Sequence, residues 1–448
     1  MVDKKFSFKD TFFIGLMMFA LFFGAGNMIF PPSLGQDAGT NVWVAILGFL
    51  ITGVGLPLCG VIAVSISGSS LRDLSNKVHP VFGVIFTSIC FLVIGPFFAT
   101  PRTGTVAFEI GVTPFLPPSV HAHGLPLAIY TIIFFGVTLW LCLNPTKLVD
   151  RIGKILTPVL LLVIAIIVVK GIIHPIDHYS QPVTSYAAHP FFNGFLHGYL
   201  TMDAIASLIF GIVVTKAVKD KGITSQKKIS KVTIGSGIIA AIGLALVYIS
   251  LAFIGATSKG LVGQTSNGGD ILTTVTQYLY GGAGQMLLAL AITFACLTTA
   301  IGLITSCAEY FSNMMPKISY RWFVVIFSAF SALVANVGLT QLIMISAPVL
   351  TAIYPLTIVL IILTFIDKSI GVSRGIYVGA LIGAGVISIF DGLKGAGIQF
   401  QAAENLLGHL PLYTDGMGWL IPAFVCGIIG LVISKLKASK TAQRKNAA

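Results

Sequence analysis

Residues 23–32 interrupt an apolar stretch with residue types that open a helix. The run reads Phe-Gly-Ala-Gly-Asn-Met-Ile-Phe-Pro-Pro, and it lies inside a segment, 11–34, that is otherwise apolar enough to cross a membrane. Glycine and asparagine at that depth free backbone amides and carbonyls, which the hydrocarbon core of a bilayer cannot solvate. Such a break persists only where it lines a cavity inside the protein, so we interpret it as half of a binding site.

An opened helix at this point offers both poles that a small zwitterion needs. The half that begins near Asn27 presents free amides and the positive end of the helix dipole, which suit a carboxylate. The half that ends near Phe23 presents free carbonyls, which suit a cation. We therefore assign Gly24, Ala25, Gly26 and Asn27 to substrate binding. The alternative is that the glycines only let helices pack closely.

A second apolar segment, 191–217, carries the one carboxylate that we place near the centre of a span, Asp203. Burial of that charge is costly unless it is paired or functional. Its partner is a coupling cation, a substrate ammonium or a transported proton, and the alternative is a structural hydrogen bond that braces the helix. The candidate site includes its neighbours Tyr199, Thr201, Ala204, Ile205 and Ser207.

Two adjacent hydroxyls, Thr298 and Thr299, lie in a third apolar segment, 283–310. A hard monovalent cation prefers oxygen ligands, so this pair together with carbonyls of the first segment is a candidate cation site. Taken alone, such a pair is more often a packing feature of a membrane helix.

Arg102 is expected near the outer end of its span, at a distance from this candidate site. Counting about 1.5 Å per residue from Pro80 places it about 33 Å along the helix. We interpret it as an interfacial anchor or a member of a local ion pair with a residue such as Glu109, rather than as a gate.

Membrane-spanning helices are the elements that must position all of these residues. Of the 448 residues, 56% are hydrophobic and only 9% are charged, with a mean hydropathy of +0.95. Apolar blocks of about 20 residues, the length that spans a bilayer, recur along the chain. We expect one all-α transmembrane domain, 1–448, with twelve spans: 11–34, 41–68, 80–111, 125–143, 152–173, 191–217, 231–256, 283–310, 322–337, 342–366, 375–391 and 417–435.

The lysines and arginines are distributed asymmetrically between the two sides of this arrangement. If the N-terminus faces inward, 23 of the 27 fall in inner segments, and the others are Arg102, Lys170, Lys259 and Lys394. The positive-inside rule then places both termini in the cytoplasm and supports an even number of spans. We therefore expect a multi-pass protein of the plasma membrane.

The two segments with interrupting polar residues are the first and the sixth of the expected spans, so the second lies five spans after the first. Because five is odd, the two segments enter the membrane from opposite sides, as in an inverted repeat. We expect repeat one at 8–174, repeat two at 191–366 and two extra helices within 375–435. Paired interrupted helices in inverted halves indicate a secondary-transporter site near the middle of the membrane.

No arrangement of residues in the sequence indicates an enzyme. The sequence contains no phosphate-binding glycine loop of the P-loop type, no metal-binding histidine pair on a helix and no nucleophile elbow. With no nucleotide site, the energy for uphill movement has to come from an ion gradient. Besides the lipid bilayer and a small-molecule substrate, we expect no nucleic acid and no obligate protein partner.

Three stretches resemble the branched-chain amino acid:cation symporter family, the BrnQ-type carriers of Leu, Ile and Val. They are Phe-Gly-Ala-Gly-Asn-Met-Ile-Phe-Pro-Pro-Ser-Leu-Gly at 23–35, Pro-Arg-Thr-Gly at 101–104 and Gly-Tyr-Leu-Thr-Met-Asp-Ala at 198–204. The resemblance covers essentially the whole chain. It implies the LeuT-like architecture of the neurotransmitter:sodium symporters, with two inverted repeats of five helices in which helices 1 and 6 are broken.

By the same resemblance, Ala20, Phe23, Ala295, Thr298 and Thr299 would form the cation site. Carbonyls of Ala20 and Phe23 and the two threonine hydroxyls would hold one Na⁺, although H⁺ coupling is also open. One departure concerns gating, since better-known members of the fold have an arginine just before the proline in helix 1. This chain has Phe30 at that position, so their gating ion pair is not transferred.

We therefore expect a symporter that imports Leu, Ile and Val by alternating access, with an apolar pocket between helices 1, 3, 6 and 8. The substrate carboxylate would meet the amides of the first break, and the ammonium would meet carbonyls of the second break or Asp203. A carrier of the same fold for a different small substrate is the alternative, and an ion channel is a more distant one. A hydrophobic pocket separates aliphatic side chains by only about 1–3 kcal/mol per methylene, so overlapping use of the three amino acids is expected.

Overall fold

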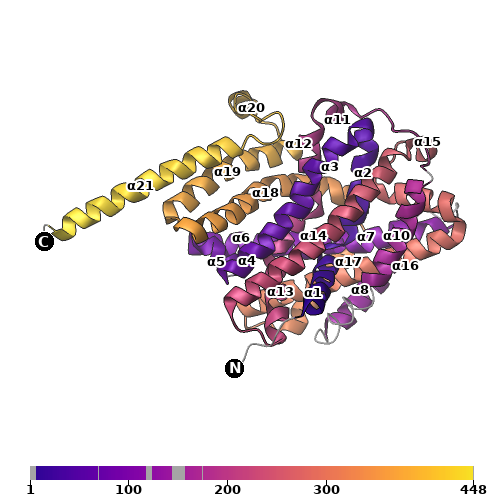
Figure 1. Cartoon of the computed structure of the whole chain (residues 1–448), viewed down its shortest axis with the longest axis horizontal. Helices are drawn as coiled ribbons and strands as arrows, with labels where there is room; N and C mark the ends of the chain where they lie inside the picture. The colour runs from indigo at the N-terminus through magenta and orange to yellow at the C-terminus, as the bar shows by residue number, and fades with distance from the viewer. Residues whose placement is uncertain (1–6, 69, 118–123, 144–156, 174, 447–448) are drawn as a thin grey trace.

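The computed structural model describes residues 7–68, 70–117, 124–143, 157–173 and 175–446, and all of the regular structure in these ranges is helical (Figure 1). The first five residues of the expected span 152–173 and the last residue of the expected repeat 8–174 lie outside these ranges. The first half of the chain contains α1 (Phe8–Phe22), α2 (Ala25–Ala38), η1 (Gly39–Asn41), α3 (Val42–Leu50), η2 (Ile51–Gly55), α4 (Leu56–Ser67), α5 (Leu71–Asn76), α6 (Pro80–Leu92), η3 (Val93–Phe97), α7 (Ala99–Gly111), η4 (Thr113–Phe115), α8 (Leu125–Cys142) and α10 (Thr157–Ile173).

The second half of the chain is built in the same way. It contains α11 (Thr184–Ala188), α12 (Pro190–His197), η7 (Gly198–Thr201), α13 (Asp203–Asp220), α14 (Gln226–Ala256), α15 (Lys259–Val262), α16 (Gly268–Met314), α17 (Tyr320–Ala335), α18 (Leu339–Ile370), α19 (Arg374–Gly395), α20 (Gln401–Leu407) and α21 (Leu420–Asn446). Within the described ranges, seven helices are long and apolar enough to cross a membrane, or eight if α12 and α13 count as one bent span. Three shorter apolar helices accompany them. The chain is thus a multi-pass membrane protein, while the count of twelve spans stays a prediction.

The first interruption expected from the sequence is present, and it is shorter than the run of residues that indicated it. Helix α1 ends at Phe22, and α2 begins at Ala25. Between them Gly24 is extended, with φ −118° and ψ −159°, and this two-residue gap at Phe23 and Gly24 is the first break. Pro31 and Pro32 lie inside α2 and do not end it.

The second interruption lies where Asp203 predicted it. The four residues of η7 form a 3₁₀ turn, and Met202 after them adopts a left-handed conformation with φ +66°. The axes of the flanking helices differ in direction by 45°. Residues 198–202 are the second break. A non-glycine residue with positive φ is uncommon and indicates a local conformation that the surroundings impose.

Close backbone contacts hold the first broken helix against α14. A Cβ placed on Gly35 would lie 1.9 Å from the carbonyl oxygen of Ala252, and one placed on Gly255 would lie 1.9 Å from that of Pro32. The two helices therefore approach each other through glycine from both sides, as small residues allow in membrane proteins. This packing fixes α2, and with it the first break, relative to α14.

Helix α7 reaches the interior by a bent path. A π-helical turn, η3, precedes it, and inside that turn Gly95 has a non-helical conformation and is followed by Pro96. Proline and π-turns are usual causes of sharp kinks. The kink redirects the chain before α7 packs along α16 and against α2.

The last helices form a separate side of the molecule. In Figure 1, α18, α19 and α21 run side by side, and the end of α21 projects away from the remaining helices. The expectation that the final two spans lie outside the repeats stays a prediction, because α18 belongs to the expected repeat two and packs with α19. The functional residues below all come from the other helices or from the two breaks.

Candidate binding site between the two broken helices

Both breaks border one small interior cavity. Its wall comes from α1, α2, η3, α7, the second break, α13 and α16, and its polar or charged side chains are Asn27, Arg102, Thr103, Thr201, Asp203 and Thr299. The cavity volume is about 30 Å³, enough for an ion or a few water molecules. An amino acid can enter only if side chains in the wall move.

The first break is capped by its own sequence. The Gly24 amide donates to Asn27 Oδ1 at 3.1 Å, whereas in an uninterrupted helix it would donate to the carbonyl of Ala20. Asn27 therefore replaces the missing helical partner of Gly24 and turns the Ala20 carbonyl into an available oxygen. The sequence predicted free groups at this break, and the structure shows which amide is already used.

Asn27 also connects the first break to Asp203. Its Nδ2 donates to Asp203 Oδ2 at 2.5 Å and also to the hydroxyl oxygen of Tyr248 on α14. The Tyr248 hydroxyl in turn lies 3.4 Å from Asp203 Oδ2 and donates to it. All three side chains are at most 4% exposed. The carboxylate is thus buried with two donors and with access to the cavity.

Arg102 lies at the second break and not near an outer interface, where counting along a straight span placed it. Its side chain is 3% exposed and lines the cavity. Nη1 donates to the carbonyl of Leu200 at 2.7 Å and Nη2 to that of Thr201 at 3.4 Å. The kink at Gly95 and Pro96 explains the error, because the count assumed an unbroken helix from Pro80.

The Arg102 guanidinium lies between the two breaks. Its Cζ lies 5.0 Å from the ring centroid of Phe30 on α2, within cation–π range. A Cβ added to Gly26 would come within 2.8 Å of Nη2 and 3.1 Å of the Phe30 ring. Glycine at this position leaves room for the guanidinium against the backbone of α2.

The two threonines of the candidate cation site differ in their surroundings. Thr298 donates its hydroxyl back to Ala295 in its own helix at 2.8 Å. Thr299 lines the cavity, and its buried Oγ1 has no hydrogen-bond partner among the described residues. A Cβ on Gly24 would lie 2.8 Å from that oxygen, so the hydroxyl lies directly against the first break. An unpartnered hydroxyl oxygen of this kind suits a hard cation.

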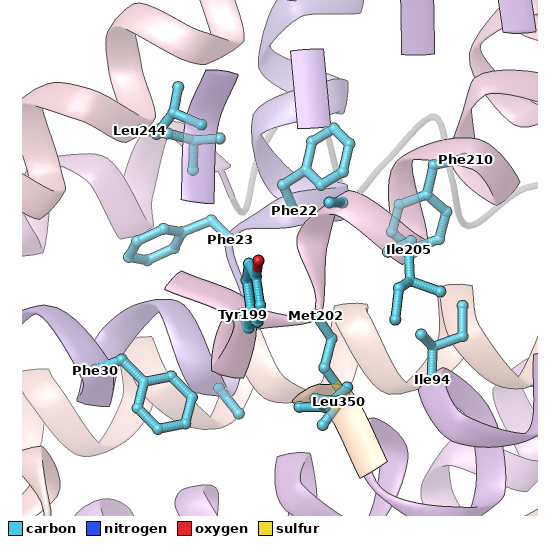
Figure 2. Packing of buried hydrophobic residues seen from close by; sticks show 14 of the residues in the cluster. Phe22, Phe23, Phe30, Ile94, Tyr199, Met202, Ile205, Phe210, Leu244 and Leu350 are labelled. Atoms are coloured by element: carbon cyan, nitrogen blue, oxygen red, sulfur yellow. The ribbon is translucent and has the colours of Figure 1, made fainter. Parts of the chain in front are cut away.

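Four of the expected substrate residues pack behind the cavity wall. Tyr199 stacks on Tyr354 with a centroid distance of 4.3 Å. Ser207 donates to the carbonyl of Ala204 at 2.7 Å, while Ala204 and Ile205 are fully buried. Figure 2 shows Ile205 beside Ile94, with Tyr199 and Met202 close to each other at the second break.

The other expected residues divide between the cavity wall and its surroundings. Gly24, Ala25, Gly26, Asn27, Thr201, Asp203 and Thr299 lie in the wall. Phe23 stacks on Phe19 with a centroid distance of 5.0 Å, and Ala20 and Ala295 are buried nearby in α1 and α16. A binding role for each of these residues stays a prediction.

Arg102, Tyr248 and Phe30 belong to this site but were not assigned to it from the sequence. Tyr248 lies in the expected span 231–256 with nothing in its neighbours to mark it. For Arg102 a usable signal existed, because Gly95 followed by Pro96 inside an apolar span predicts a kink. Phe30 was noted only for the absence of an arginine at its position.

Known proteins match this chain over nearly its whole length. A family model described as branched-chain amino acid transport protein matches residues 7–437. The chain is 52% identical over 427 residues to the branched-chain amino acid permease BraB of Bacillus subtilis, covering 95% of this chain and 96% of that protein. It is 45% identical over 427 residues to the branched-chain amino acid transport system 2 carrier protein of Pseudomonas aeruginosa, covering 95% and 96%.

Solved structures with this fold have little sequence similarity to the chain. MhsT in complex with L-phenylalanine matches with a TM-score of 0.58 at 14% identity, covering 94% of this chain and 98% of that one. Mhp1, a nucleobase-cation-symport-1 family transporter in a closed conformation with bromovinylhydantoin bound, matches with a TM-score of 0.60 at 13% identity, covering 96% and 93%. The chain therefore has the LeuT-like fold of these transporters, as its resemblance implied.

Proposed function

This chain belongs to the branched-chain amino acid transport protein family, and we propose that it imports Leu, Ile and Val together with Na⁺ by alternating access. Its relatives are named as permeases and carrier proteins and not as enzymes. The observation that carries the proposal is that two broken helices meet at one buried cavity with an acidic, a basic and an unpartnered hydroxyl group in its wall.

The polar groups of the cavity match the two ends of an α-amino acid. The N-terminus of α2 favours a carboxylate. Asp203 favours an ammonium. The apolar wall, which includes Leu21, Phe22 and Phe210, accommodates an aliphatic side chain. Transport requires the cavity to widen, because its present volume is smaller than that of a Leu molecule.

The proposed Na⁺ site lies between the first break and α16. The Ala20 carbonyl, released from the Gly24 amide, and the Thr299 hydroxyl are its first oxygen ligands. The carbonyl of Phe23 and the hydroxyl of Thr298 complete the expected set, the latter after breaking its bond to Ala295. A hard cation favours such a set of neutral oxygens.

The proposal includes twelve spans, with residues 8–174 and 191–366 as inverted halves and both termini in the cytoplasm of a plasma-membrane protein. The two breaks support this arrangement, because they lie in the first and the sixth expected spans, which cross the membrane in opposite directions. Movement of the broken helices against their neighbours would expose the cavity to each side in turn.

Uptake of labelled Leu into proteoliposomes tests the function. An inward Na⁺ gradient is expected to drive accumulation above equilibrium, and an equal K⁺ gradient is not. Ile and Val are expected to compete with Leu, while Lys and Glu are not. Loss of competition by Ile and Val would contradict the substrate class, and a Na⁺-independent current without amino acid would indicate a channel.

H⁺ is the second candidate for the coupling ion, because Asp203 is a buried carboxylate at the cavity. A proton gradient imposed without Na⁺ separates the two possibilities. Accumulation of Leu under that gradient would replace Na⁺ with H⁺ in the proposal. The substrate class would remain unchanged.

A further inference from the structure

Arg102 is a buried cation whose direct contacts are all with neutral groups. Both of its hydrogen bonds go to backbone carbonyls of the second break, and its remaining close neighbour is the ring of Phe30. Within the described part of the chain, no carboxylate oxygen lies within 4 Å of its nitrogens. Asp203 in the same cavity wall interacts with this charge only at longer range, so an anion in direct contact would further stabilise the buried guanidinium.

The arrangement of its hydrogen bonds leaves one edge of the guanidinium available. Nε is buried and has no hydrogen-bond partner among the described residues. Nη2 makes only the long 3.4 Å bond to Thr201, whereas Nη1 makes the short 2.7 Å bond to Leu200. Nε and Nη2 together form the side edge of the guanidinium, which binds a carboxylate through two parallel hydrogen bonds.

We propose that this edge of Arg102 receives the α-carboxylate of the transported amino acid, an assignment that rests on the proposed function. The bond from Nη1 to Leu200 stays in place and holds the side chain at the second break. Nη2 exchanges its weak bond to Thr201 for a bond to the substrate. Arg102 thus supplements the α2 amides, one of which is already used by Asn27.

The exchange links the two poles of the substrate. When Nη2 leaves Thr201, that carbonyl becomes an acceptor for the substrate ammonium, close to Asp203. The cavity wall then holds one cation and one anion for a molecule that carries both charges. A ligand without a carboxylate cannot release Thr201 in this way, so Arg102 determines specificity for amino acids over amines.

Binding of two matched ligands to variants of the purified protein tests this assignment. The ligands are Leu and 3-methylbutylamine, which is Leu without its carboxylate, and the readout is the ligand-induced rise in unfolding temperature at increasing concentrations. Arg102→Gln is expected to weaken Leu binding by about 10- to 100-fold, the range for a hydrogen bond to a charged group. Binding of the amine should change by less than about 3-fold.

Two further variants give the experiment its controls. Arg321→Gln makes the same chemical change at an exposed position of α17 and should leave both affinities unchanged. Arg102→Lys keeps the charge but loses the two-bond edge, so its preference for Leu over the amine should fall between those of the native protein and Arg102→Gln. If Arg102→Gln does not fold, the preference of Arg102→Lys for Leu over the amine tests the assignment on its own.

Equal weakening of both ligands by the Arg102 variants, or an unchanged preference for Leu, would overturn the assignment and leave Arg102 as a support for the second break. Failure of the native protein to bind Leu, Ile or Val is a different result. It would refute the proposed function itself.

Discussion

The two breaks are built from different kinds of contact, although they border the same cavity. At the first break, Asn27 caps the Gly24 amide three residues before it, so the partner is local in sequence. At the second break, Arg102 holds the carbonyls of Leu200 and Thr201 from a distance of about one hundred residues in sequence. Each break also has a contact of the other kind, the Asn27–Asp203 bond at the first and the bond from the Asp203 amide to the Thr201 hydroxyl at the second. The difference is that a side chain distant in sequence holds the backbone carbonyls of the second break.

This difference also separates the proposed tasks of the two breaks. The first break faces Thr299 on one side and Arg102 on the other, through Gly24 and Gly26. At the second break, the contact from α7 is made by Arg102. A change at the first break can therefore affect the cation and the substrate separately, while a change at the second break should affect substrate binding.

Asp203→Ala is expected to have the largest effect, because Asp203 connects the breaks. Its removal leaves donors of Asn27 and Tyr248 buried without their acceptor, at about 1–3 kcal/mol each. We expect Leu uptake to fall more than about 100-fold, and an unfolding temperature below that of the native protein. Asp220→Ala, at the exposed end of the same helix, is the control. Normal uptake by Asp203→Ala would remove this carboxylate from the site.

Gly24→Ala and Gly26→Ala should separate the two faces of the first break. The new methyl group at position 26 would lie 2.8 Å from Arg102 Nη2, and that at position 24 would lie 2.8 Å from Thr299 Oγ1. We expect Gly26→Ala to weaken Leu binding at saturating Na⁺, and Gly24→Ala to raise the Na⁺ concentration needed for half-maximal uptake, each about 10-fold. If both variants change Leu binding and the Na⁺ requirement to the same extent, the cation and the substrate do not use separate faces of the first break.

Thr299→Ala should have a smaller effect, confined to the cation. Its hydroxyl has no partner among the described residues, whereas that of Thr298 is bonded within its helix. Loss of one oxygen ligand is expected to raise the half-saturating Na⁺ concentration several-fold, and Thr298→Ala should change it by less. Measurement of Leu uptake against Na⁺ concentration checks this order. A larger change for Thr298→Ala than for Thr299→Ala would mean that the cation binds beside Thr298 instead.

Met202→Ile is expected to have the smallest effect. An L-residue in the left-handed conformation of Met202 already costs about 1–2 kcal/mol, and a β-branched residue is less suited to it than methionine. Met28→Ile is the matched control, because Met28 is also buried but lies in regular helix after the first break. The unfolding temperature should fall further for Met202→Ile. Equal temperatures would mean that the second break relaxes without strain.

The features that depend on local sequence were predictable. Gly24, Gly26 and Asn27 marked the first break because their effect on a helix is local, and Asp203 marked the second because a charge in an apolar segment is exceptional. The family resemblance and the all-helical fold are confirmed by the comparisons and by the helices of the described residues. The sequence run 23–32 suggested a longer interruption than the two-residue break that the structure shows.

The features that depend on tertiary contact were not predictable in the same way. Arg102 was misplaced because the path of α7 is set by the kink at Gly95 and Pro96, which a count of residues along a straight helix cannot include. Tyr248 meets Asn27 across 221 positions of the sequence, and its own neighbours are ordinary apolar residues. Thr298 and Thr299 are chemically alike, and only the rotation of α16 decides which one faces the first break.

An experimental structure with Leu and Na⁺ bound would test the central claim most directly. The account predicts the amino acid between the first and second breaks, with its carboxylate at Arg102 and the N-terminus of α2, and the cation beside Thr299. An amino acid bound elsewhere in the protein, with Arg102 still bonded to Leu200 and Thr201 and the cavity still closed, would contradict it.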